Sequence, residues 1–282
     1  MQAQKRALAI HDISCVGRCS LTVALPILSA AGVDTAILPT AVLSTHTGGF
    51  TGYTFRDLTE DIRPIEQHWA SLGLAFDAIY TGYLGSLAQV ALVEEVASRH
   101  TAQGGFVLVD PVMGDGGKLY PGFGADFPAA MAGLCRKADV IVPNFTEAAL
   151  LLGRPYQANF TPAEVDALLA DLAELAQADV VLTGVWEGDS LLGAACLERK
   201  SGRISRAMAP YIPGYFHGTG DVFGSALTAA LLCGQSLSAA MQTAVTYTQR
   251  SIDLTRTLAQ EARYGVCFEK ALPELLRLLG IA

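Results

Sequence analysis

The chain alternates short apolar runs with longer segments whose apolar residues recur at helical spacing. The short runs lie at residues 7–11, 35–42, 78–81, 106–109, 140–142 and 180–183. Helical spacing is found at residues 20–31, 87–103, 125–136 and 162–176. Thr161 followed by Pro162 is a typical helix start, because proline suits the first helical position. Strands that alternate with helices of this length predict a parallel sheet covered by helices on both faces.

The pattern changes after residue 190. Residues 191–198 and 203–209 flank a Lys-Ser-Gly turn and predict antiparallel strands added to the sheet. From Gly220 onward the sequence is nearly all helical. No Pro/Ser tract, low-complexity stretch or charge run marks a linker, and 51% hydrophobic residues suffice for a large core. We therefore expect one α/β domain over residues 1–282, with ligands beyond the carboxyl ends of the strands.

Charge and hydropathy exclude several classes of function. The net charge is −8 and no Lys/Arg cluster occurs, which argues against a nucleic-acid partner. No apolar stretch is long enough to span a membrane. The apolar run at the start of the chain is too short for a signal peptide, so we expect a cytoplasmic protein. The six cysteines form no CxxC pair, which favours reduced, mostly buried thiols over a zinc site.

The segment His217-Gly218-Thr219-Gly220-Asp221 leads directly into an Ala/Leu-rich helix. Glycines at alternate positions allow backbone N–H groups to point at one spot, and a helix N-terminus adds unpaired donors. Such a turn suits a phosphoryl group in transfer. A carboxylate beside it would repel phosphate, but it fits a base that accepts the proton of an attacking hydroxyl. A simple glycine turn with Asp221 as helix cap is the structural alternative.

Further segments extend this interpretation. No Walker A sequence occurs, which excludes a P-loop as the phosphate site. HGTGDVFGSALTAALL resembles the C-terminal signature of the ribokinase superfamily. ALAIHDISCVGRCSL, VLSTHTG, TGYLGS, VDPVMGD and VPNFTEA precede it in the order of the vitamin kinase branch. That branch contains pyridoxal kinases and hydroxymethylpyrimidine kinases, and STHTG with TGYLGS is closer to the former.

The resemblance implies a ribokinase-like three-layer α/β/α fold with a mostly parallel central sheet and a small β lid. It also implies ATP-dependent phosphorylation of the 5′-hydroxymethyl group of pyridoxal, pyridoxine or pyridoxamine, with Mg²⁺ and possible use of K⁺, in a homodimer. Asp221 would be the base, and the amides around Gly218, Thr219 and Gly220 would hold the γ-phosphate. Asp110 and Glu147 would organise Mg²⁺ largely through water, with Asp110 also near a monovalent cation.

The remaining implied roles concern the two substrates. Asp115, Asn144 and Thr183 would lie along the nucleotide, and Asp12, His46, Thr47 and Tyr83 would line the ring pocket. Residues 44–53 could close over the substrate and exclude water.

Two alternatives stay open. Many pyridoxal kinases carry serine at the position of Asp12, whereas pyrimidine kinases usually carry aspartate, so a hydroxymethylpyrimidine kinase or a dual-specificity enzyme is possible from the sequence. A non-catalytic vitamer sensor is the third reading, although a sensor would not need Asp221.

Overall fold

The computed structural model describes residues 4–281 and is built on one large sheet. In this described part of the chain, nine strands lie in the order β11-β10-β9-β8-β5-β4-β1-β2-β3. Their bounds are β1 Arg6–Ser14, β2 Asp34–Leu43, β3 Phe55–Asp57, β4 Phe76–Thr81, β5 Thr101–Val109, β8 Val140–Ile141, β9 Asp179–Glu187, β10 Leu191–Glu198 and β11 Arg203–Pro210. The six strands from β9 to β2 pair in parallel, while β3, β10 and β11 are antiparallel additions at the two edges.

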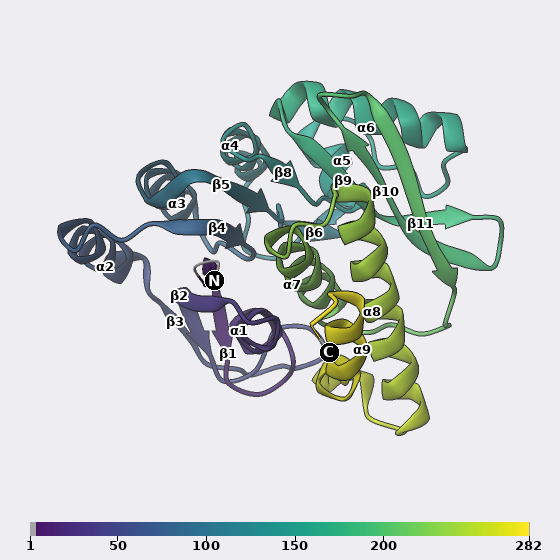
Figure 1. Ribbon diagram of the computed structural model, residues 1–282, viewed down its shortest axis with the longest axis horizontal. Helices are drawn as coiled ribbons and strands as arrows, with labels where there is room; N and C mark the ends of the chain where they lie inside the picture. Colours follow the sequence, from purple (N-terminus) through teal and green to yellow (C-terminus); the bar gives the residue numbers. More distant parts are fainter. Residues whose placement is uncertain (1–3, 282) are drawn as a thin grey trace.

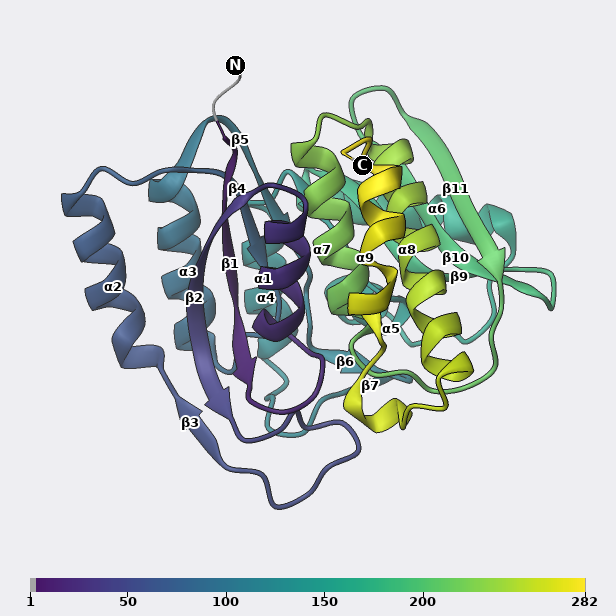
Figure 2. The ribbon, with the colours of Figure 1, turned by 60° about the horizontal axis from the view of Figure 1, so that its bottom comes forward.

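Helices cover both faces of this sheet (Figures 1 and 2). One face carries α1 (Leu21–Ala30), α7 (Thr219–Leu232), α8 (Leu237–Thr257) and α9 (Phe268–Leu278). The other carries α2 (Thr59–Ser71), α3 (Leu87–His100), α4 (Phe127–Cys135), α5 (Phe145–Leu151) and α6 (Pro162–Ala176). Each face has its own apolar cluster, and together they confirm the expected three-layer α/β/α fold.

The buried strands explain why the sequence pattern was informative. β1 pairs with β2 on one side and with β4 on the other, so that Leu8 lies beside both Ala36 and Ile79. A strand in this position is covered on both faces and therefore reads as a continuous apolar run. Within residues 4–281 no helix combines the length and apolar character needed to cross a bilayer.

Some elements have weak sequence signals. α2 contains Pro64, which interrupts the helical pattern, and all three residues of β3 are exposed. A hairpin of β6 (Gly114–Asp115) and β7 (Lys118–Leu119) is separate from the main sheet. The expectation of mostly buried cysteines is wrong for Cys15 and Cys233, which are exposed, because neither lies on a face that packs against the sheet.

The start of α6 is as the sequence predicts. Thr161 is the N-cap; its hydroxyl accepts from the N–H of Glu164, and the Glu164 carboxylate accepts from the N–H of Thr161 at 2.7 Å. This reciprocal pair satisfies two N–H groups that the helix itself cannot bond.

We expect Thr161→Ala to lower the free energy of unfolding by about 1 kcal/mol, because the cap hydroxyl is lost. Urea denaturation followed by circular dichroism measures this change. Thr161→Ser keeps the hydroxyl and is the control, with stability close to that of the parent protein. Equal losses in the two variants would contradict a capping role.

Candidate active site

The site lies where the chain order reverses in the sheet. From β1 the chain moves to β2 on one side and later to β4 on the other. Side chains at the carboxyl ends of β1 and β4 therefore border the crevice where ligands bind in open α/β sheets. Helix α7 lies between α1 and α8 on the adjacent face (Figure 2), and its N-terminal turn carries the HGTGD segment.

The first turn of α7 presents free backbone amides. Gly218 caps the helix with φ of 74°, and a Cβ there would lie 2.0 Å from the carbonyl oxygen of Arg18, so only glycine fits. The first internal bond of the helix runs from the N–H of Val222 to the oxygen of Gly218. Among residues 4–281, no acceptor takes the N–H of Gly218, Thr219 or Gly220. Donors gathered at a helix start make an anion site.

Asp221 lies in the same turn and is largely buried, with 16% of its side chain exposed. Burial raises the pKa of Asp221 to about 7, against the lowering effect of the N–H of Ser20, and nearby Asp12 raises it further. A carboxylate whose pKa lies near neutrality is suited to accept a proton and release it again.

Ser20 connects two carboxylates and was not identified from the sequence. Its hydroxyl donates to Asp12 at 2.5 Å, and Ser14 donates to the other oxygen of Asp12 at 3.1 Å. Its backbone has φ of 58°, which is uncommon for a residue with a side chain. Burial raises the pKa of Asp12, while the two serine hydroxyls lower it.

Asp110 and Glu147 form a buried acidic pair. Burial first, and then Glu147 and Asp221, hold the pKa of Asp110 well above its usual range. Burial raises the pKa of Glu147 to about 8, although its oxygens accept from the N–H groups of Met113 at 3.2 Å and Asn144 at 2.9 Å. Buried carboxylates favour a bound cation, because the positive charge lowers their pKa values again.

This donor set fits Mg²⁺ better than a metal that needs a full set of protein ligands. Between residues 4 and 281 no three His, Cys, Asp or Glu side chains are grouped to hold a metal. Mg²⁺ commonly takes one or two carboxylates and completes its coordination with water and substrate phosphates. The backbone bonds of Glu147 favour a contact through water.

The three residues predicted to lie along the nucleotide have different surroundings from one another. Asn144 caps α5, accepts from the N–H of Glu147 and donates to the oxygen of Gly114 at 3.0 Å, so its amide is already engaged. Thr183 forms an isolated bridge with Asn144 next to β8. Asp115 is exposed on the β6–β7 hairpin and accepts from the hydroxyl of Tyr215 at 3.3 Å.

On the ring side, Asp12 and Tyr83 lie close together. Burial raises the pKa of Tyr83 and the charge of Asp12 adds to this effect. His46 is buried, and its Nε2 lies 2.6 Å from the carbonyl oxygen of Arg263, whereas Thr47 is exposed. The structure thus places His46 and Thr47 in the loop that follows β2, with the imidazole turned toward the C-terminal region.

The two ends of that loop, residues 44–53, are joined by hydrogen bonds. Thr54 donates to the hydroxyl of Ser44 at 2.9 Å, and the N–H of Ser44 donates back to Thr54 at 3.2 Å. Farther along, the ring of Phe50 lies 5.4 Å from that of Tyr264, and the ring of His46 lies 5.1 Å from that of His217. The loop therefore reaches the turn before α7.

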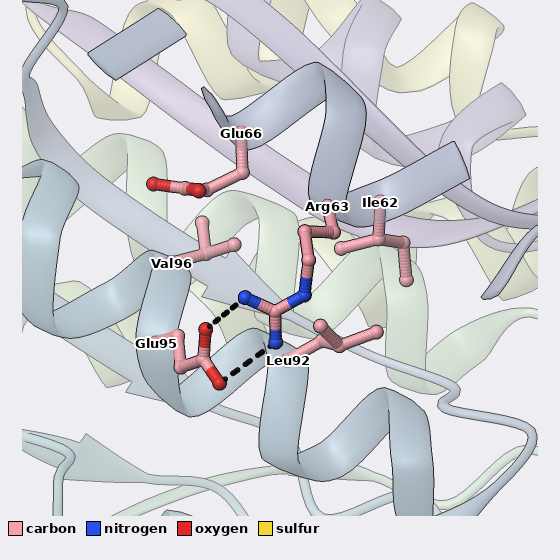
Figure 3. A pocket seen from close by; sticks show the side chains of 6 residues that line it. All are labelled: Ile62, Arg63, Glu66, Leu92, Glu95 and Val96. Carbon is pink, nitrogen blue, oxygen red and sulfur yellow. Dashed lines mark hydrogen bonds and ion pairs between the residues drawn. The ribbon is translucent and has the colours of Figure 1, made fainter. Parts of the chain in front are cut away.

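A second crevice lies away from these residues, between α2 and α3. It is lined by Ile62, Arg63, Glu66, Leu92, Glu95 and Val96 (Figure 3). An ion pair of 2.9 Å between Arg63 and Glu95 bridges it, and Glu66 pairs with Arg99 at 2.6 Å. Its charged groups are mutually neutralised, which is typical of helix packing.

Comparison with known protein families shows to which family this chain belongs. The family model described as phosphomethylpyrimidine kinase matches residues 26–266, which is most of the chain. The chain belongs to the phosphomethylpyrimidine kinase family. The resemblance to the vitamin kinase branch is thereby confirmed.

Individual relatives include pyridoxal kinases and a protein assigned as a phosphomethylpyrimidine kinase. The pyridoxine/pyridoxal/pyridoxamine kinase of Bordetella avium is 31% identical over 85% of this chain and 82% of its own length. The pyridoxal kinase of Lactobacillus plantarum has a TM-score of 0.91 at 35% identity and covers 98% of both chains. A Bacteroides thetaiotaomicron protein assigned as a phosphomethylpyrimidine kinase, crystallised with pyridoxal, has a TM-score of 0.92 at 38% identity and covers 97% of this chain and 96% of its own.

The raised pKa of Asp221 has a consequence for stability. Because this pKa rises from 3.8 to about 7 on folding, the folded state holds the proton more tightly, and stability falls as pH rises through this window. We expect Asp221→Asn to stabilise the ligand-free protein, with a gain at pH 8 that exceeds the gain at pH 5 by about 1–3 kcal/mol.

Chemical denaturation at the two pH values measures this difference. Asp189→Asn, at the exposed turn between β9 and β10, is the control, with the same small effect at both pH values. An equal gain for Asp221→Asn at pH 5 and pH 8 would show that its carboxyl group is not perturbed by burial.

Proposed function

We propose that this protein transfers the terminal phosphoryl group of ATP to the 5′-hydroxymethyl group of pyridoxal, pyridoxine or pyridoxamine. The observation that carries the proposal is the turn at the start of α7. It combines the carboxylate of Asp221 with the amides of Gly218, Thr219 and Gly220, which no acceptor within residues 4–281 takes. The names of the relatives support the choice of B6 vitamers, and both core clusters pack on the same sheet, which supports a single domain over residues 1–282.

In this proposal Asp221 accepts the proton of the hydroxymethyl group as its oxygen attacks the γ-phosphorus. The amides around Gly218, Thr219 and Gly220 stabilise the charge on the transferred group, which is spread over its outer oxygens. Because these donors are already in position, they need no rearrangement during the reaction. The remaining acceleration comes from holding the two substrates in line.

Asp110 and Glu147 would hold Mg²⁺, Asp110 more directly and Glu147 through water. The ion, when bound, neutralises the phosphate oxygens of the nucleotide. Asp110 also adjoins the place that the family resemblance gives to K⁺. The high pKa of both carboxyl groups supports a site that gains a cation and loses protons when the nucleotide binds.

The nucleotide would extend from the α7 turn past Thr183 toward Asp115. Asn144 would act mainly through its backbone and by fixing Glu147, since its side chain is engaged in the cap of α5. Tyr215 bonds Asp115 from the loop that leads to Gly218. These two loops would therefore meet beside the phosphates.

The vitamer ring would lie against Asp12 and Tyr83, with the loop of residues 44–53 as a lid. Thr47 is free to contact a ligand, whereas His46 would act by fixing the lid to Arg263. A closed lid excludes water and limits hydrolysis of ATP. The cytoplasmic location and the homodimer stay predictions from the sequence and the family resemblance.

A pyrimidine substrate is the second candidate, because of Asp12. This carboxylate is 5% exposed and can accept a hydrogen bond from a ring amino group, which hydroxymethylpyrimidine has and pyridoxal lacks. The family model carries the name of that activity. The enzyme could therefore act on both rings.

Turnover on a substrate panel tests the function. We expect ADP release with pyridoxal, pyridoxine and pyridoxamine, and a fall in kcat of about 10²–10⁴-fold for Asp221→Asn, since proton transfer to the base is lost. A coupled ADP assay with hydroxymethylpyrimidine in the same panel separates the two ring classes. Absence of turnover on every ring would favour the sensor, and an active Asp221→Asn enzyme would remove the base assignment.

Asp12→Asn tests ring recognition separately. Loss of a charged acceptor costs about 1.5–3 kcal/mol, so we expect KM for the preferred ring to rise about 10–100-fold. KM for ATP is the internal control and should stay unchanged, because Asp12 is on the ring side. A rise confined to hydroxymethylpyrimidine would identify the pyrimidine as the substrate that Asp12 recognises, and no change in any ring KM would remove Asp12 from the pocket.

A further inference from the structure

His11 is a polar side chain in the middle of the apolar strand β1. It has no exposed surface, and neither ring nitrogen has a hydrogen-bond partner among the described residues. A buried polar group without a partner costs about 1–3 kcal/mol, so its presence calls for a reason. Burial lowers the pKa of His11 to about 3, and the imidazole is therefore neutral at physiological pH.

The surroundings of His11 are shaped to its ring. A Cβ at Gly82, directly after β4, would lie 2.1 Å from Nδ1 of His11. On the same face of the sheet, the ring of Tyr80 meets the imidazole edge-on with centroids 4.4 Å apart. The Tyr80 hydroxyl is likewise buried without a hydrogen-bond partner in the described part of the chain, and a Cβ at Gly224 of α7 would lie 2.4 Å from it. Glycines on two elements thus make room for this polar pair.

The carboxylate of Asp221 lies beside the ring of His11. Nδ1 of His11 lies 3.9 Å from Oδ1 of Asp221, which is about 1 Å longer than a hydrogen bond. Two further carboxylates lie near this cluster: Asp12 raises the pKa of Asp221, and Asp110 raises the pKa of Tyr80. Because these neighbours are acceptors, a neutral imidazole can contribute what the base lacks, which is an N–H donor.

We propose that His11 is a positioning residue for phosphoryl transfer, whose Nδ1–H bonds Oδ1 of Asp221 and leaves Oδ2 directed at the substrate hydroxyl. This rests on the proposed role of Asp221 as the base. A small rotation of either side chain closes the gap when the substrates bind, because catalytic hydrogen bonds often tighten only in the reacting complex. The imidazole stays neutral throughout, and the substrate proton passes to Asp221 alone.

Three substitutions at position 11 separate positioning from packing. The amide nitrogen of His11→Asn can occupy the place of Nδ1, whereas that of His11→Gln reaches only the place of Nε2. His11→Leu has similar volume and no donor. We expect kcat with pyridoxal and ATP to fall about 10–100-fold in His11→Leu and His11→Gln, corresponding to loss of one hydrogen bond to a charged group. His11→Asn should stay within about 5-fold of the parent enzyme on the same grounds, and KM for either substrate should change little.

Stability provides a second readout. A residue kept for packing would lower stability when replaced, but an unpartnered polar group that is replaced by an apolar one of similar shape leaves stability equal or higher. We therefore expect His11→Leu to melt at the same temperature as the parent protein or above it while it turns over more slowly. Thermal melts of all three variants without ligands measure this.

Several outcomes overturn the proposal. They are an unchanged kcat in His11→Leu, or an Asn variant no faster than the Gln variant. Should His11→Leu fail to fold, the comparison of Asn with Gln still decides. Asp221→Asn is measured alongside: if it remains active, the base assignment fails and the role of His11 falls with it. If it is inactive while all His11 variants match the parent, the role of His11 alone is wrong.

Discussion

The rest of the site depends on the backbone amides at the start of α7, which have no acceptor among the described residues. A helix cannot satisfy its own first N–H groups, and a capping side chain can bond one of them, as Thr161 does for α6. Here Gly218 occupies the cap position and offers no side chain. The donors are therefore left for a ligand, and their direction is fixed by a backbone conformation that the oxygen of Arg18 restricts to glycine. The side chains at the carboxyl ends of β1 and β4 lie near this turn because the strand order of the sheet reverses beside it.

The second constraint is electrostatic. Asp12, Asp110, Glu147 and Asp221 gather acidic groups in a protein of net charge −8, and burial raises the pKa of all four. Without ligands such a cluster is destabilising and retains protons. A cation that binds beside these groups changes this balance, since positive charge favours the ionised carboxylates. The proposed base is thus ionised, and available to accept a proton, in the state in which a proton has to be accepted.

Much of the fold could be predicted from the sequence, because β-rich runs and helical spacing follow burial directly. The runs that became β1, β4, β5 and β9 are apolar since helices cover both faces of the sheet. The amide turn and its aspartate could be predicted too, because alternate glycines before a helix allow the backbone N–H groups to point at one spot. Ser20 and His11 could not. Their importance comes from contacts between segments distant in sequence, such as β1 with α7, which no local pattern encodes. The spacing of Asn144 and Glu147 is that of a capping box, so the engagement of the Asn144 side chain could have been predicted. Nothing in the sequence shows that His46 faces Arg263.

The conformation of Ser20 has a wider consequence. Through its hydroxyl this residue holds the carboxylate assigned to the ring, and its backbone N–H acts on the carboxylate assigned to the proton. A change that enlarges or reshapes the ring pocket at Asp12 is therefore transmitted through a single strained peptide to the reacting centre. Altered ring preference in this protein should come at the expense of rate unless the segment that follows β1 is redesigned as a unit.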